Sequence, residues 1–310
     1  MENNLFRLFG LFFNRALLIA IFSTGFGLIF AAGAAAGQLT VYTVNYPLQY
    51  FAQRIAGEHA EVVFPAPPQV DPAFWMPDKQ TIRDYQEADL VLLNGAGYAK
   101  WVKKVSLPRL RQVDTSASFA GGYIAVQNTV THSHGPAGDH SHAGTAFTTW
   151  LDFYQAVQQA ESVMQALAEK QPANKAVFER NFAALRKDLM ALDLEMQKTV
   201  AGRPGQPLLA SHPVYQYPAR RYLLHIETVQ WEPETVPEDD EWQRLRYATE
   251  DFPAQWMLWE KQPVSETIKR LDAMGIGVLV FDPCAGRPEQ DDFLGVMQQN
   301  VQNLKRAYQE

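Results

Sequence analysis

The chain has 310 residues, of which 47% are hydrophobic and 20% are charged, and its formal net charge is −7. This composition is typical of a globular protein with a sizeable core, and the net acidic charge argues against nucleic acid as a partner. Because Cys284 is the single cysteine, no internal disulfide can form and the core alone must hold the fold.

The first 36 residues differ in composition from the rest. They begin weakly basic, with Arg7 and Arg15, continue through an almost wholly apolar stretch at 16–36, and end in small residues. This pattern predicts a signal peptide at 1–36 that is cleaved on export to the periplasm. An uncleaved membrane anchor is the alternative, since about 20 apolar residues can span a bilayer.

Strand and helix patterns alternate in the region that follows. The predicted strands are 39–44, 61–65 and 89–94, and the predicted helices are 46–56 and 79–87. Strands that alternate with helices pair in parallel through crossovers, so we expect an N-terminal α/β lobe over 37–172.

A histidine-rich loop at 131–144 interrupts this lobe. It holds four of the chain's seven histidines among Gly, Ser and Pro residues: His132, His134, His140 and His142. Neutral imidazole is the commonest protein ligand for zinc and similar metals, so the loop indicates metal handling. A solvated polar loop is the alternative interpretation.

Two long helical patterns come next, at 151–170 and 174–200. The second carries one apolar stripe at three- and four-residue spacing and predicts a long linking helix over 173–202. Its length, close to 40 Å at 1.5 Å per residue, is enough to run along a molecule of two lobes.

The α/β pattern resumes in a C-terminal lobe over 203–310. The predicted strands are 207–210, 256–259 and 277–281; the predicted helices are 215–222, 265–274 and 291–308; and the acidic stretch 232–241 is expected to be a solvated connector. Three potential ligands follow strands directly: His212, Glu260 and Asp282. Ligands bind at the carboxyl ends of parallel strands, so these side chains are candidates for holding a cation.

Several stretches together resemble the solute-binding proteins of zinc and manganese ABC importers, the helical-backbone metal receptor family. Among them are Ala88-Asp-Leu-Val-Leu-Leu-Asn-Gly-Ala-Gly97, Trp150-Leu-Asp152 and Phe281-Asp-Pro283; the others lie at 42–52, 71–77, 211–222 and 297–300. The resemblance implies an α/β fold of two lobes, each with a mostly parallel sheet flanked by helices, joined by one long backbone helix. It also implies a metal site in the interlobe cleft and, as partners, an importer permease and ATPase.

The chain departs from the family pattern at two expected ligands. Ala73 and Thr148 stand where the family has histidines in the N-terminal lobe, whereas His212 and Asp282 match the two ligands of the C-terminal lobe. Three explanations remain open. The loop histidines fold in and complete the site; Glu260 or a water completes a more oxygen-rich site; or the cleft takes another solute against an aromatic lining.

We therefore expect a monomeric periplasmic protein that binds zinc, with manganese or copper as alternatives, and delivers it without turnover. His212 and Asp282 are the expected fixed ligands, with the loop histidines or Glu260 completing the set. The alternatives are a binder of a metal complex or small organic solute, and a periplasmic metallohydrolase with Glu260 as base.

Overall fold

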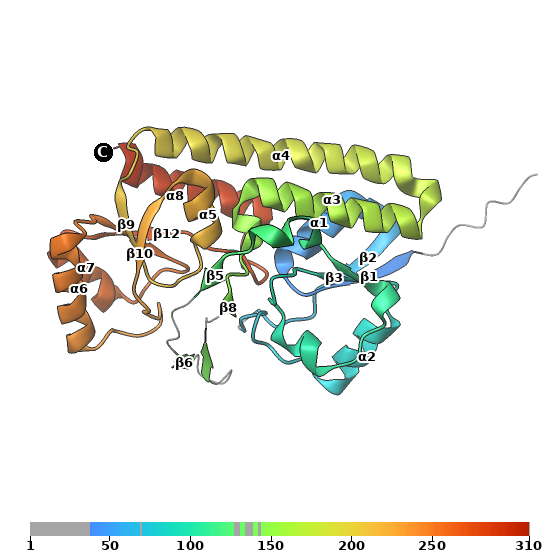
Figure 1. The fold of residues 1–310 in the computed structure, drawn as a ribbon, viewed down its shortest axis with the longest axis horizontal. Helices are drawn as coiled ribbons and strands as arrows, with labels where there is room; N and C mark the ends of the chain where they lie inside the picture. The colour runs from blue at the N-terminus through green and yellow to red at the C-terminus, as the bar shows by residue number, and fades with distance from the viewer. Residues whose placement is uncertain (1–37, 69, 127–130, 134–138, 142–143, 310) are drawn as a thin grey trace, which may run out of the picture. The chain divides into compact units, whose positions relative to one another are not determined.

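A parallel sheet in the strand order β2-β1-β3-β4 forms the centre of the N-terminal lobe (Figure 1). The computed structural model describes residues 38–68, 70–126, 131–133, 139–141 and 144–309. The elements of this lobe are β1 (Leu39–Thr43), α1 (Tyr46–Ala56), β2 (Ala60–Val63), α2 (Lys79–Glu87), β3 (Leu90–Leu93) and β4 (Gln112–Asp114). The order places β1 at an inner position, which accounts for its buried Val41 and Thr43.

Local chemistry fixes both ends of α1. The side chain of Asn45 accepts a hydrogen bond from the backbone N–H of Leu48 at 3.1 Å, and Pro47 lies in the first turn. Such caps satisfy amide groups that a helix start leaves without partners. The helix ends at Gly57, whose φ of 56° is a conformation that glycine adopts at little cost.

The C-terminal lobe has a second parallel sheet, in the order β10-β9-β11-β12. Its elements are β9 (Pro207–Ala210), α5 (Gln216–Tyr222), β10 (His225–Thr228), α6 (Asp239–Asp251), β11 (Trp256–Trp259), α7 (Ser265–Ala273), β12 (Gly277–Val280) and α8 (Phe293–Gln309). A cluster of tryptophans packs between this sheet and α6, with the Trp231 and Trp242 ring centroids 4.7 Å apart.

Two long helices follow the N-terminal sheet, α3 (Phe153–Lys170) and α4 (Lys175–Ala201), and α4 leads into the C-terminal lobe (Figure 1). The 27-residue α4 packs on α3 and α1 and also on α8 of the C-terminal lobe. Its predicted apolar stripe is buried: Phe178, Phe182, Leu185, Leu189, Leu192 and Met196.

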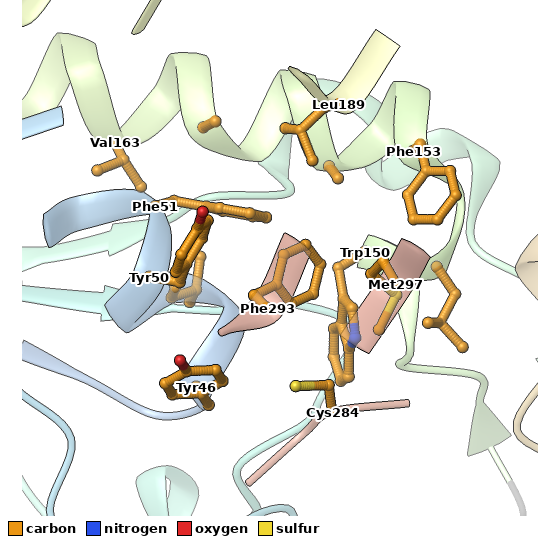
Figure 2. Packing of buried hydrophobic residues seen from close by; sticks show 14 of the residues in the cluster. Tyr46, Tyr50, Phe51, Trp150, Phe153, Val163, Leu189, Cys284, Phe293 and Met297 are labelled. Carbon is orange, nitrogen blue, oxygen red and sulfur yellow. The ribbon is translucent and has the colours of Figure 1, made fainter. Parts of the chain in front are cut away.

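Both lobes share one hydrophobic core. Figure 2 shows Phe293 of α8 between Phe51 of α1 and Trp150, and the Phe51 and Phe293 rings meet edge to face at 5.3 Å. Trp150 also donates from Nε1 to the carbonyl of Pro283 at 2.7 Å. Cys284, the single cysteine, is buried in this shared core (Figure 2). Apolar packing therefore continues from one lobe to the other.

The predicted fold class, with two parallel sheets and one long helix, is confirmed. Among the strands of the two four-stranded sheets and the α-helices, three elements were not predicted: β4, the edge strand β10, and α6, which begins inside the expected acidic connector. Short antiparallel pairs also form, β5 (Ala125–Val126) with β8 (Gly144–Thr145) and β6 (Thr131–Ser133) with β7 (Asp139–Ser141). No helix among the described residues is both long and apolar enough to cross a bilayer, and the predicted signal at 1–36 lies outside those residues.

Candidate metal centre

Four acidic or imidazole side chains follow the four strands of the C-terminal sheet. Backbone hydrogen bonds continue each pairing beyond the strand ends: Ser211 N–H to Leu258 O at 2.8 Å, Trp231 N–H to Ser211 O at 3.0 Å, and Phe281 N–H to Trp259 O at 2.8 Å. The residues next in the chain are His212, Glu232, Glu260 and Asp282. In strand order this edge row runs Glu232, His212, Glu260, Asp282, so the sheet itself brings these groups together.

Within the edge row, His212 lies between two carboxylates. Its Nε2 is 3.2 Å from Glu232 Oε1, and its Nδ1 is 3.4 Å from Glu260 Oε1. The imidazole is only 3% exposed, so both contacts form away from bulk water. This geometry favours the protonated ring, because each nitrogen then faces a negative charge.

The edge row shifts the pKa values of its own members. Burial acts to lower the pKa of His212, but the hydrogen bond to Glu232 and the charge of Glu260 outweigh it and raise that pKa. Burial raises the pKa of Glu260, His212 opposes the rise, and Asp71 and Asp282 add to it. Groups whose pKa values shift through mutual contact are candidates for a functional site.

Asp282 is held rigidly at the end of the edge row. Its backbone N–H donates to Asn300 Oδ1 at 2.9 Å, and its carbonyl accepts from Asn300 Nδ2 at 2.7 Å. Its carboxylate oxygen Oδ1 accepts from the Cys284 N–H at 2.6 Å. Burial raises the pKa of Asp282, and the Cys284 hydrogen bond and Lys261 oppose the rise. The carboxylate is therefore oriented before any ligand arrives.

The two positions that lack the family's histidines have structural roles here. Ala73 is fully buried, and its carbonyl accepts from the Lys100 N–H at 3.1 Å. The Thr148 hydroxyl donates to the carbonyl of Val214 at 2.6 Å, which ties the N-terminal lobe to the loop after His212. Neither residue offers the cation an imidazole.

Asp71 of the N-terminal lobe acts electrostatically on the edge row. The charge of Asp71 acts on Glu260 of the edge row and on the Tyr98 hydroxyl. Tyr98 is 1% exposed, and its hydroxyl has no hydrogen-bond partner among the described residues. Burial lowers the pKa of Lys100, and the charge of the Asp71 carboxylate partly opposes that lowering.

The histidine-rich loop is described only in part. The strands β6 and β7 pair antiparallel, with His132 opposite His140 in the backbone register. His134 and His142 lie outside the described residues. The predicted role of these four histidines therefore stays a prediction.

The edge row is a line of ion pairs and not a closed metal cage. Among the residues that the structure describes, no group of three or more His, Cys, Asp or Glu side chains is arranged to hold a metal ion. His212, Glu260 and Asp282 come together as neighbours on adjacent strands, as the strand-end argument predicts. Glu232 was missed, because the strand β10 that positions it was not predicted.

Comparison with protein-family models identifies the family of this chain. The family model described as zinc-uptake complex component A, periplasmic (ZnuA), matches residues 41–307. The chain belongs to this family. The match agrees with the resemblance inferred from the sequence motifs.

Among curated proteins, the zinc-binding lipoprotein AdcA of Streptococcus pneumoniae is 23% identical over 287 residues, which cover 88% of this chain and 56% of AdcA. The chain thus spans little more than half the length of the first relatives. The manganese ABC transporter substrate-binding lipoprotein PsaA of Streptococcus pneumoniae is 25% identical over 215 residues, 66% of this chain and 67% of PsaA. These names describe binding proteins and not enzymes, in agreement with the prediction that this chain is no enzyme.

Solved structures share the fold. The metal-dependent lipoprotein YcdH of Bacillus subtilis matches with a TM-score of 0.75 at 20% identity, over 87% of this chain and 100% of YcdH. The Zn(II)-bound ZnuA-like domain of Streptococcus pneumoniae AdcA matches with a TM-score of 0.74 at 18% identity, over 88% of this chain and 100% of that domain. At these identities the likeness establishes the fold.

Proposed function

We propose that this protein captures a divalent metal cation in the periplasm and hands it to an ABC importer made of a permease and an ATPase. The observation that carries the proposal is the edge row, in which His212, Glu260 and Asp282 gather at the carboxyl ends of adjacent parallel strands. Imidazole with carboxylates is a donor set for borderline divalent cations.

Zinc is the first cation to test. The matched family is described by zinc uptake, and AdcA is named for zinc binding. Manganese is the main alternative, because PsaA is named for manganese transport and the edge row contains more carboxylates than imidazoles; copper is a weaker one. The cation is cargo in this proposal, so the protein has no resident metal.

Export and chain organisation complete the proposal. A cleaved signal at 1–36 would release a monomer with an N-terminal lobe at 37–172, a linking helix at 173–202 and a C-terminal lobe at 203–310. The loop histidines His132, His134, His140 and His142 would serve as capture ligands or would complete the site.

Calorimetric titration of the metal-stripped protein with zinc tests the proposal. The double variant His212→Ala/Asp282→Ala is expected to lose roughly a hundredfold or more in affinity, since direct ligands matter at least as much as the residues behind them. A matched control is His225→Ala/Asp272→Ala, which removes the same residue types from exposed positions of the same lobe. Unaltered zinc binding by the first double variant would reject the edge row as the site.

A second candidate function is the binding of a metal complex or another small solute. It is favoured by the absence of imidazoles at Ala73 and Thr148 and by the aromatic packing of Phe74, Tyr98 and Phe147 beside them. Native mass spectrometry of protein purified from the periplasm would distinguish the two, because a bare cation and an organic cargo differ in mass.

A further inference from the structure

The outward side of α4 differs in charge from the rest of the molecule. In Figure 1 this helix runs along one side of the fold, and α1, α3 and α8 pack against its inner side. Exposed residues recur on the outward side at three- and four-residue spacing and form an outer stripe: Arg180, Ala183, Lys187, Ala191, Leu194 and Lys198. At 1.5 Å per residue the outer stripe is about 27 Å long. It has cations and apolar residues but no carboxylate, in a chain whose net charge is −7.

The carboxylates of α4 lie outside the outer stripe, and each is paired with a cation. The four pairs, with their N···O distances, are Arg54–Asp188 at 2.8 Å, Lys305–Glu195 at 2.6 Å, Arg221–Asp193 at 2.9 Å and Lys175–Glu179 at 3.7 Å. Four other cations of the helix form no ion pair within the described part of the chain: Arg180, Arg186, Lys187 and Lys198. The exposed Glu161 and Glu169 of the neighbouring α3 do not reach them either. The protein itself therefore leaves this positive charge without contacting anions.

A hollow lies beside the outer stripe. Its volume is about 310 Å³, and it is lined by Phe182, Ala183, Arg186, Lys187 and Met190. The short side chain of Ala183 leaves room between larger neighbours. Phe182 is buried and Met190 half-buried, so the floor is apolar, whereas Arg186 and Lys187 are exposed. An apolar floor bordered by cations suits a molecule in which an anionic group is joined to an apolar one.

We propose that the outer stripe and this hollow dock on the anionic surface of a phospholipid bilayer. Headgroup phosphates accept hydrogen bonds from the four unpaired cations, and Leu194 and the floor of the hollow contact the apolar region beneath the headgroups. Basic and apolar residues on one exposed helix face are the pattern by which helices bind at anionic bilayer surfaces. The inference goes beyond the proposed function, because it holds the exported protein at a membrane whether or not a cation is bound.

A second copy of this chain is a poorer occupant of the surface. A symmetric pair places the same patch of both copies face to face, so the cations of one outer stripe would meet those of the other. Like charges at such distances repel. A bilayer instead presents many phosphates in one plane, and the outer stripe presents its cations along one straight helix, so several contacts form together.

Co-sedimentation of the exported protein with lipid vesicles tests the proposal. Binding is expected with mixed phosphatidylglycerol and phosphatidylcholine, should weaken as salt is raised, and should be absent with phosphatidylcholine alone. Arg186→Gln/Lys187→Gln is expected to weaken vesicle binding roughly thirtyfold, since each cation near an anionic surface contributes about fivefold. Equal binding to both kinds of vesicle, or to neither, overturns the proposal.

The matched control is Lys103→Gln/Lys104→Gln, which removes the same charge from two adjacent exposed positions of the N-terminal lobe. No change in vesicle binding is expected. Equal losses in the two double variants would show that binding follows net charge and not the outer stripe. Zinc titration of Arg186→Gln/Lys187→Gln is expected to match that of the unaltered protein, so this proposal and the proposed function fail separately.

A dye attached to the outer stripe locates the contact. Because Cys284 is buried, a thiol-reactive dye labels Leu194→Cys at the new thiol. An environment-sensitive dye there is expected to shift its emission to the blue with the mixed vesicles. The same dye on Leu110→Cys, where the side chain is 94% exposed in the N-terminal lobe, is expected to stay unchanged. A response at 110 and none at 194 rejects the outer stripe as the contact.

A protein partner gives a different result. Importer reconstituted in phosphatidylcholine alone offers no anionic lipid surface. Retention of the unaltered protein on that importer, lost in Arg186→Gln/Lys187→Gln, would assign the outer stripe to a protein contact and overturn the lipid assignment.

Discussion

Two carboxylates, Glu232 and Glu260, face the ring nitrogens of His212, and together they raise its pKa despite burial. A group whose pKa is raised by folding stabilises the fold while it is protonated. That stabilisation is fully present below the ordinary histidine value of about 6.5 and is lost as the pH rises through the raised value.

The metal-free protein is therefore expected to lose melting temperature as the pH rises above about 6.5, and His212→Gln is expected to flatten this dependence. Thermal unfolding of both proteins over this range measures the difference. A slope that is the same in the two proteins would show that His212 does not carry the effect.

Glu232 Oε1 lies 3.2 Å from Nε2 of His212 and favours the protonated ring, so a cation that binds this imidazole must compete with a proton. Glu232→Gln removes the charge and the strong acceptor, so the pKa of His212 should fall. The pH at which zinc binding is half lost is then expected to move to lower pH, as followed by titration at several pH values. A shift to higher pH would indicate that Glu232 binds the cation directly.

Much of the candidate site followed from the sequence, because His212, Glu260 and Asp282 each come after a strand with a clear apolar pattern. The position of Glu232 could not be predicted in this way. The strand before it, β10, has the sequence His-Ile-Glu-Thr, is mostly exposed and therefore has no apolar pattern. The influence of Asp71 on Glu260 acts between lobes, and no spacing in the chain encodes it.

At the scale of elements, α4 is attached to the C-terminal lobe through a buried carboxylate. Asp193 is 2% exposed and accepts from Arg221 Nε at 3.0 Å, Arg221 Nη2 at 2.9 Å and the Tyr222 hydroxyl at 3.0 Å. Asp193→Ala leaves the buried Tyr222 hydroxyl and the partly buried Arg221 guanidinium without this acceptor, so a loss of about 3 kcal/mol in the free energy of unfolding is expected.

Asp188→Ala on the same helix is the matched control. Its pair with Arg54, at 2.8 Å, has side chains that are 41% and 34% exposed. Exposed pairs contribute only about 0–1 kcal/mol. Chemical denaturation of both variants measures the contrast, and equal losses would refute the role assigned to Asp193.

The same contrast between buried and exposed positions explains which elements could be predicted. The helices α1 and α2 have the predicted bounds, since a cap and an apolar face mark each of them. The helix α6 was missed because its start is acidic and polar. A capping box between Glu238 and Glu241 begins it, and only Trp242 and Leu245 among its residues are buried.

At the scale of the whole described unit, the shared core limits how far the lobes can separate. Phe51, Trp150 and Phe293 pack across both lobes (Figure 2). The Tyr46 N–H also donates to the Ala285 carbonyl at 2.9 Å. Opening the lobes would expose this apolar surface to water, which is unfavourable in proportion to its area.

Zinc binding is therefore expected to change side chains and loops while leaving the radius of gyration unaltered. Small-angle X-ray scattering of the metal-free and zinc-loaded protein measures this. A resolvable contraction on loading would show that the lobes close as rigid bodies.

The buried thiol of Cys284 allows opening of the shared core to be measured. Its thiol is enclosed in the shared core, and burial raises its pKa well above the ordinary range, so a disulfide reagent should find it unreactive in the native protein. The reagent can then react only when the protein opens, so the labelling rate measures how often the shared core opens. A chain with one thiol gives one unambiguous signal, read without adding a probe.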